Sequence, residues 1–214
     1  MFVTSNLEVS GELIASINEI IKKFRKSNAK FLGRTTIFSF FYTNRRDSPD
    51  FRVRVTNGKS ELVLKYRQNE AFLNRKEITI PIPNKNLSDA IEMLRLLGWI
   101  SGVISADDLY KFRYKGVKFT LVDTGMVTYF KAEKQMKDKG KLTEERNCII
   151  KLCKELGMKP FNGDEFYNLI NKMAISKERQ FNFNEERFEY IENKFKRYFY
   201  VSRGEKEAKV KITS

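Results

Sequence analysis

The chain has 214 residues, of which 41% are hydrophobic and 13% aromatic, enough to bury a core and to exclude wholesale disorder. Its 41 lysines and arginines exceed its 27 acidic residues, and the resulting net charge of +14 favours polyanionic partners such as nucleic acid, nucleotides or polyphosphate. A basic surface without a partner is the alternative. The chain has no histidine, which excludes Ser-His-Asp and Cys-His catalytic pairs and any metal site that needs imidazole.

Features that would direct the chain to a membrane or to secretion are not seen. No apolar run approaches the ~20 residues of a membrane span, and no signal peptide is evident, so we expect a cytoplasmic protein. The two cysteines, Cys148 and Cys153, have neither redox-motif nor zinc-site spacing. We expect two buried free thiols.

The first half of the chain predicts short strands and two helices. Asn57-Gly58 is a strong signal for a tight hairpin turn, because both residues tolerate positive φ. In chain order, we expect a strand over 6–10, a helix over 13–24, strands over 35–43, 51–55, 61–67 and 76–82, and a helix over 87–97.

The second half predicts three more strands and three helices. Asp107-Asp108 is typical of a loop or turn. In chain order, we expect strands over 111–114, 117–123 and 127–134, then helices over 143–156 and 164–173 and a charged final helix. The final helix carries an apolar stripe of Phe188, Ile191, Phe195 and Phe199, which packs on its own domain or docks on a partner.

Alternating strands with helices inserted between hairpins indicate an α+β fold rather than repeated βαβ units. The spacing is compatible with a strongly curved antiparallel sheet or with a closed barrel. We predict a closed antiparallel β-barrel with flanking helices over residues 1–175, followed by a C-terminal helical extension over 176–214.

Charged residues repeat along one face of several predicted strands. Alternation places Arg52 with Arg54, Lys111 with Arg113, and Lys65 with Glu61. For a single strand, a solvent-exposed face is the simpler interpretation. Repetition over five strands favours a shared enclosure in which cations converge on an anion, because isolated buried cations are costly.

The motifs FRVRV, LVLKYR, NRKEI, YKFRYKGVKFTLVD and YFKAEK stand in an order that resembles the CYTH family of triphosphate tunnel metalloenzymes. That family includes thiamine triphosphatases, inorganic triphosphatases and class IV adenylyl cyclases. The resemblance covers residues 7–175 and implies a barrel whose interior, the triphosphate tunnel, holds a triphosphate with Mg²⁺ or Mn²⁺.

Carried over to this chain, the resemblance implies a set of site residues. We predict catalytic roles for Lys65, Arg113 and Glu133. The predicted phosphate-binding residues are Arg52, Arg54, Lys65, Arg75, Lys111, Arg113 and Lys131. The predicted metal ligands are Glu8, Glu77, Asp123 and Glu133.

Three positions depart from the family's acidic motifs. The opening ExExK pattern is matched by Glu8-Val9-Ser10-Gly11-Glu12, so a carboxylate is replaced by Ser10 and a lysine by Glu12. Near the end, one carboxylate of a glutamate pair is Lys131. These changes weaken a metal site, and the ammonium of Lys131 can partly substitute for the charge of the metal.

Two functions are therefore favoured. One is a metal-dependent phosphohydrolase acting on a nucleoside, inorganic or thiamine triphosphate or on an RNA 5′-triphosphate end. The other is a non-catalytic module that binds a nucleotide, polyphosphate or RNA end, as the missing carboxylates favour. A structural protein that docks through its Phe-rich C-terminal helix is a third, and cyclase activity is the least supported.

Overall fold

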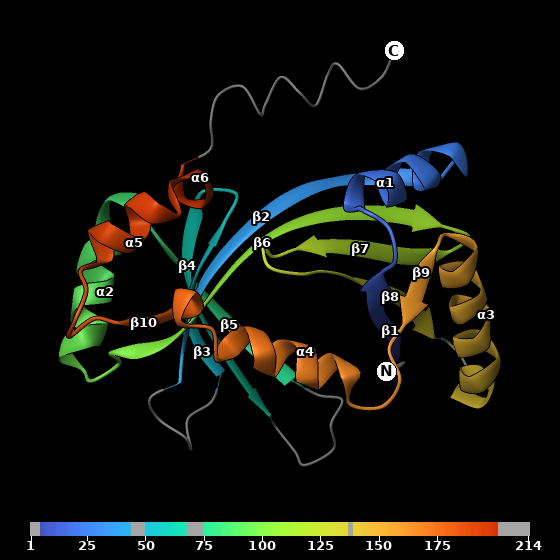
Figure 1. Ribbon diagram of the computed structural model, residues 1–214. Coiled ribbons are helices and arrows are strands. Elements are labelled where there is room, and N and C mark those ends of the chain that lie inside the picture. Colours follow the sequence, from blue (N-terminus) through green and yellow to red (C-terminus); the bar gives the residue numbers. More distant parts are fainter. Residues whose placement is uncertain (1–4, 44–49, 68–74, 137–138, 201–214) are drawn as a thin grey trace. The chain divides into compact units, whose positions relative to one another are not determined.

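A computed structural model describes residues 5–43, 50–67, 75–136 and 139–200 (Figure 1). The chain forms two compact units, each described separately below. The first unit comprises Met1–Thr35 and Asp107–Met173, and the second comprises Thr36–Ala106 and Ala174–Ser214.

The strands form a ten-stranded antiparallel sheet in the order β5-β4-β3-β2-β6-β7-β8-β1-β9, with β10 paired to β6. The long strands β2 and β6 contribute residues to both units. The strands are β1 (Ser5–Leu13), β2 (Lys30–Tyr42), β3 (Asp50–Thr56), β4 (Lys59–Arg67), β5 (Arg75–Ile82), β6 (Ser101–Tyr114), β7 (Val117–Asp123), β8 (Thr128–Met136), β9 (Met158–Pro160) and β10 (Gln180–Asn182).

Six α-helices accompany the sheet in the described residues, so the predicted α+β class is confirmed. They are α1 (Ile17–Lys26), α2 (Leu87–Leu96), α3 (Leu142–Glu155), α4 (Glu165–Ala174), α5 (Phe188–Lys194) and α6 (Lys196–Phe199). Single 3-10 turns cover Asn84–Asn86, Lys139–Lys141 and Lys177–Arg179. None of the helices in the described part of the chain is long and apolar enough to cross a membrane.

The predicted closure of the sheet into a barrel is not confirmed. Within the described residues, the strand order ends at β5 on one side and at β9 on the other, and these two strands do not pair. Pro81 lies in β5 and has no backbone N–H to donate, which suits an edge strand. At the other end, β9 has only three residues.

The core of the first unit lies between one face of its strands and the helices α1 and α3. Phe24 of α1 stacks on Phe112 of β6, with ring centroids 4.6 Å apart, and also contacts Phe119 of β7. All three rings are buried. Helix α1 begins with a capping box in which Ser16 and Glu19 bond each other's backbone N–H groups.

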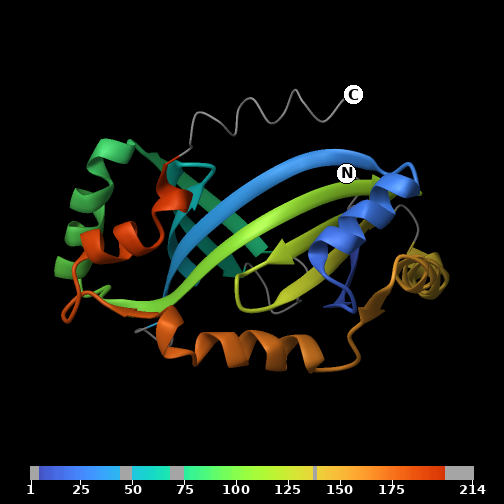
Figure 2. The ribbon, with the colours of Figure 1, turned by 45° about the horizontal axis from the view of Figure 1, so that its top comes forward.

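The core of the second unit lies between β2, β3 and β6 and three helices. Phe38 and Phe40 of β2 are fully buried among aromatic rings that include Phe199 of α6 and Phe188 of α5. Helices α2, α5 and α6 lie close together (Figure 2). The C-terminal apolar stripe therefore packs within the second unit, although the predicted single helix is broken between α5 and α6 at Phe195.

The β3–β4 hairpin turns where Asn57-Gly58 predicts. Both residues have positive φ, 48° and 73°, as a two-residue turn of this kind requires. The Asn57 side chain also accepts a hydrogen bond of 2.8 Å from the Thr36 backbone N–H of β2. This turn sets the register that aligns the charged residues of β3 and β4.

The two cysteines differ in environment, so the expectation that both are buried is wrong for one of them. Cys148 is exposed on α3, whereas Cys153 is buried in the core of the first unit. Burial raises the pKa of the Cys153 thiol to about 12.

We therefore expect a maleimide to label the folded protein at Cys148 only, because the thiolate is the reactive form and Cys153 is both inaccessible and protonated at pH 8. Mass spectrometry of proteolytic peptides would locate the label. In Cys148→Ser, labelling should require denaturant. Rapid labelling of folded Cys148→Ser would contradict the buried position of Cys153.

Candidate functional site

One face of the first unit's sheet carries two adjacent rows of polar residues that run across β1, β8, β7 and β6. Their positions follow from the strand register, because alternate residues of each strand share a face. The row of Ser10, Lys131, Thr120 and Lys111 is called the donor row. The row of Glu8, Glu133, Lys118 and Arg113 is called the ion-pair row.

Both carboxylates of the ion-pair row contact a lysine. The Nζ of Lys118 donates a hydrogen bond of 2.6 Å to the Glu133 carboxylate on the neighbouring strand. The Nζ of Lys131 lies 3.6 Å from a carboxylate oxygen of Glu8, which also accepts a hydrogen bond of 3.2 Å from the Ser10 hydroxyl. Neither glutamate is an uncompensated charge in this structure.

Lys111 has a different environment. It is half-buried, and its Nζ donates a hydrogen bond of 3.1 Å to the Thr35 hydroxyl, a neutral group. Burial and the nearby charge of Lys118 lower the pKa of Lys111, and Glu133 only partly opposes them. A bound anion would relieve this cost because it would favour the charged ammonium.

The charge within these two rows is unbalanced. The two rows contain four cations, Lys111, Arg113, Lys118 and Lys131, against two carboxylates, Glu8 and Glu133, a difference of +2. Arg113 is exposed and makes no ion pair with any residue that the structure describes. The donor row contains only ammonium and hydroxyl groups, which suit phosphate oxygens as hydrogen-bond acceptors.

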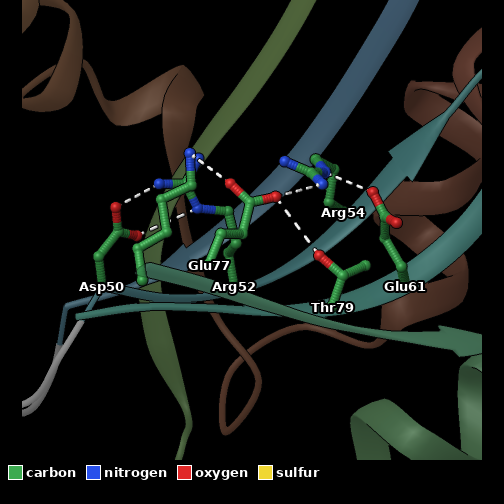
Figure 3. A network of polar contacts seen from close by, with 7 residues as sticks. Asp50, Arg52, Arg54, Glu61, Glu77 and Thr79 are labelled. Atoms are coloured by element: carbon green, nitrogen blue, oxygen red, sulfur yellow. Dashed lines mark hydrogen bonds and ion pairs between the residues drawn. The ribbon is translucent and has the colours of Figure 1, made fainter. Parts of the chain in front are cut away.

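The second unit has its own charged face, built on β3, β4 and β5 (Figure 3). Arg54 bonds the carboxylates of both Glu61 and Glu77, the latter at 2.8 Å. Lys65 lies 3.0 Å from the other oxygen of Glu77. Arg52 pairs with Asp50, and its guanidinium lies 4.1 Å from the centre of the Phe41 ring.

The ion pairs that the structure describes on this face involve equal numbers of cations and carboxylates. Three cations, Arg52, Arg54 and Lys65, face three carboxylates, Asp50, Glu61 and Glu77. Burial alone would raise the pKa of Glu77, but its bonds to Lys65 and Arg54 outweigh burial and lower the pKa to about 2. The face is therefore held by internal ion pairs.

The remaining predicted residues lie apart from these groups. Asp123 alternates with the same parity as Phe119 in β7, so its side chain lies on the aromatic side of the sheet. Lys118 and Thr120 lie on the other side. The Asp123 carboxylate accepts a hydrogen bond of 2.8 Å from the Gly125 N–H in the following turn. Glu12 pairs with Lys159 of β9 at 3.0 Å. The side chain of Arg75 lies outside the described residues.

Each carboxylate that we predicted as a metal ligand already makes polar contacts within its own unit. Among the residues that the structure describes, no three Asp, Glu or Cys side chains gather where they could hold a metal ion. Glu8, Glu133 and Glu77 are each paired with lysine or arginine, and Asp123 faces the other side of its strand. Mg²⁺ and Mn²⁺ need several free oxygen ligands.

Sequence reasoning missed two residues of the site, Lys118 and Thr120. Their signal is present in Val117–Asp123, where the polar residues Lys118 and Thr120 alternate with Phe119 and Leu121. This alternation shows that β7 contributes Lys118 and Thr120 to the site. Our prediction instead chose Asp123 because its side chain is acidic.

The ion pairs of Glu77 with Lys65 and Arg54 should contribute to the free energy of unfolding in a way that depends on pH. Because the folded-state pKa is lowered from 4.5 to about 2, this contribution is complete above pH 4.5 and is lost as pH falls towards 2. We expect Glu77→Gln to destabilise the protein at pH 7 by about 1 kcal/mol at most, because the carboxylate is partly exposed to water.

Urea unfolding of both proteins between pH 7 and pH 2.5 would test this, with the exposed Glu178→Gln of the same unit as the control. The difference between wild type and Glu77→Gln should shrink on acidification. A difference that stays constant down to pH 2.5 would contradict the assignment.

Comparison with known proteins adds evidence about the fold. No family model matches the chain, and no curated protein matches it by sequence. Among solved structures, the PH1819 protein from Pyrococcus horikoshii OT3 matches with a TM-score of 0.53 and 22% identity over 78% of this chain and 98% of that one. The PH1012 protein of the same organism matches with a TM-score of 0.52 and 20% identity, over 72% and 91%.

A candidate adenylate cyclase from Vibrio parahaemolyticus matches with a TM-score of 0.54 and 13% identity, over 78% of this chain and 98% of that one. Identities this low show the fold alone. The chain therefore has the fold of these proteins, and the resemblance of its strand motifs to the CYTH family is confirmed at the level of the fold.

Proposed function

We propose that the protein binds a triphosphate-containing anion, with the donor row and ion-pair row of the first unit as part of its binding surface. The observation that carries the proposal is Lys111, a half-buried cation beside Lys118 whose hydrogen-bond partner is a neutral hydroxyl. Lysine ammonium groups bind phosphate as point charges, and Arg113 can bind two phosphate oxygens at once.

The excess of positive charge suits a chain of phosphates better than a single carboxylate or sulfate. The four cations lie on neighbouring strands, so an extended polyanion could contact several of them. The fold shared with a candidate adenylate cyclase also supports a triphosphate, since such an enzyme acts on a nucleoside triphosphate. Inorganic, nucleoside and thiamine triphosphates and an RNA 5′ end all contain this phosphate chain.

Three predicted phosphate ligands of the second unit, whose side chains the structure describes, would bind phosphate at a greater cost. Arg52, Arg54 and Lys65 each contact a carboxylate of their own unit. A phosphate would have to replace Asp50, Glu61 or Glu77 in those ion pairs. We therefore assign the larger share of the binding free energy to the first unit.

Isothermal titration with sodium tripolyphosphate tests the proposal. We expect Lys111→Met to weaken binding roughly tenfold or more, because it removes a charged hydrogen-bond donor while keeping much of the side chain's length. Lys154→Gln removes the same charge from an exposed position on α3 and should bind like the wild type. Equal affinities for wild type and Lys111→Met would refute the proposed binding surface.

Hydrolysis of the bound triphosphate is the second candidate function. Glu133 favours it, because its carboxylate lies on the face where phosphate is proposed to bind and is held by Lys118 on the adjacent strand. A carboxylate beside a phosphate can orient an attacking water molecule, while neighbouring cations offset the negative charge of the leaving phosphate. The predicted catalytic roles of Lys65 and Arg113 belong to this candidate.

Phosphate release from tripolyphosphate and from ATP distinguishes the two functions. If the protein is a hydrolase, Glu133→Ala should lower the rate about a hundredfold, whereas Glu155→Ala, which removes an exposed carboxylate of α3, should not. Turnover that survives in Glu133→Ala would exclude Glu133 as the catalytic group. Tight binding without turnover in the wild type would identify a binding module.

A further inference from the structure

Lys131 occupies a central place among the charged residues of the first unit. It lies on β8 opposite Ser10 of β1 and Thr120 of β7, and it shares its face with Glu133 two residues along. Its Nζ is 3.6 Å from the Glu8 carboxylate and 5.5 Å from the centre of the Phe166 ring. The ammonium therefore has an anionic neighbour and an aromatic neighbour, both of which stabilise a positive charge.

The same residues are unsuited to a divalent cation. Glu8 and Glu133 face each other across the β1–β8 pair, but Lys131 and Lys118 already contact them. A divalent ion bound there would have to displace both ammonium groups or remain within a few ångströms of them, where like charges repel. The next residue along β1 on this face is Ser10, a neutral ligand.

We infer that Lys131 is a resident cation that serves in place of a divalent metal on this face, so that phosphate binding here is independent of metal. This inference rests on the proposed function for the ligand, but its metal-related part does not. A lysine ammonium has three donors, so Lys131 can keep its contact with Glu8 and still donate to a phosphate oxygen. Its ammonium thereby supplies a fixed positive charge that a metal ion bound from solution would otherwise provide.

Reversing the charge at this single position tests the inference. Lys131→Glu would place a third carboxylate beside Glu8 and Glu133 and remove the repelling ammonium. We expect this variant to bind Mn²⁺ at least tenfold more tightly than the wild type, measured by the paramagnetic resonance signal of free Mn²⁺ without phosphate. Its melting temperature should rise on addition of Mn²⁺.

Two controls accompany this measurement. Lys154→Glu makes the same charge reversal at an exposed site and should not gain Mn²⁺ affinity. The double variant Lys131→Glu, Glu8→Gln should lose most of the gain. A wild-type protein that binds Mn²⁺ as tightly as Lys131→Glu would overturn the inference, and so would a folded Lys131→Glu that gains no affinity.

Lys131→Gln covers the case in which three adjacent carboxylates prevent folding. With EDTA present, wild type should bind tripolyphosphate, and Lys131→Gln should bind it roughly tenfold or more weakly. Wild-type binding that disappears in EDTA and returns with Mg²⁺ would overturn the inference. If wild type binds no tripolyphosphate under either condition, the proposed function fails, and the Mn²⁺ titration of wild type and its variants still decides the role of Lys131.

Discussion

Antiparallel strand pairing is the constraint on which both charged faces depend. Because side chains alternate along a strand, a fixed register separates residues one position apart onto opposite sides of the sheet. In the first unit, pairing of Lys111 with Thr120 and of Phe112 with Phe119 puts charge on one side and the aromatic core on the other. A register slip of one residue would bury the lysines and expose the phenylalanines.

Ion pairing distinguishes the two faces that this register creates. In the second unit Arg52, Arg54 and Lys65 each contact a carboxylate within their own hairpins, so these three cations are internally compensated. In the two rows of the first unit the cations outnumber the carboxylates, and the burial of Lys111 near Lys118 has an electrostatic cost, seen in its lowered pKa. Such a cost is tolerated where the surrounding fold is well packed, as it is around Phe24 and Phe112.

The sequence predicted the hairpin at Asn57-Gly58 and the shared face of Arg52 and Arg54, because both depend on local geometry. It did not predict that β6 begins at Ser101, because Asp107-Asp108 is typical of a turn. Both residues lie in the strand, where Asp108 is buried and accepts a hydrogen bond of 3.1 Å from Arg34. That partner is distant in sequence and gives no local signal. Closure of the sheet likewise depends on long-range pairing.

Gly11 shows how the first unit can change its chemistry while keeping its structure. A Cβ atom at this position would lie 2.2 Å from the Lys159 backbone oxygen and would also meet the Phe130 ring, so no larger residue fits without separating β9 from β1. Its neighbours Ser10 and Glu12 point to the opposite side, away from that contact. Substitutions at positions 8, 10 and 12 can therefore change the charge of this face, while glycine at position 11 preserves the pairing of β1 with β9.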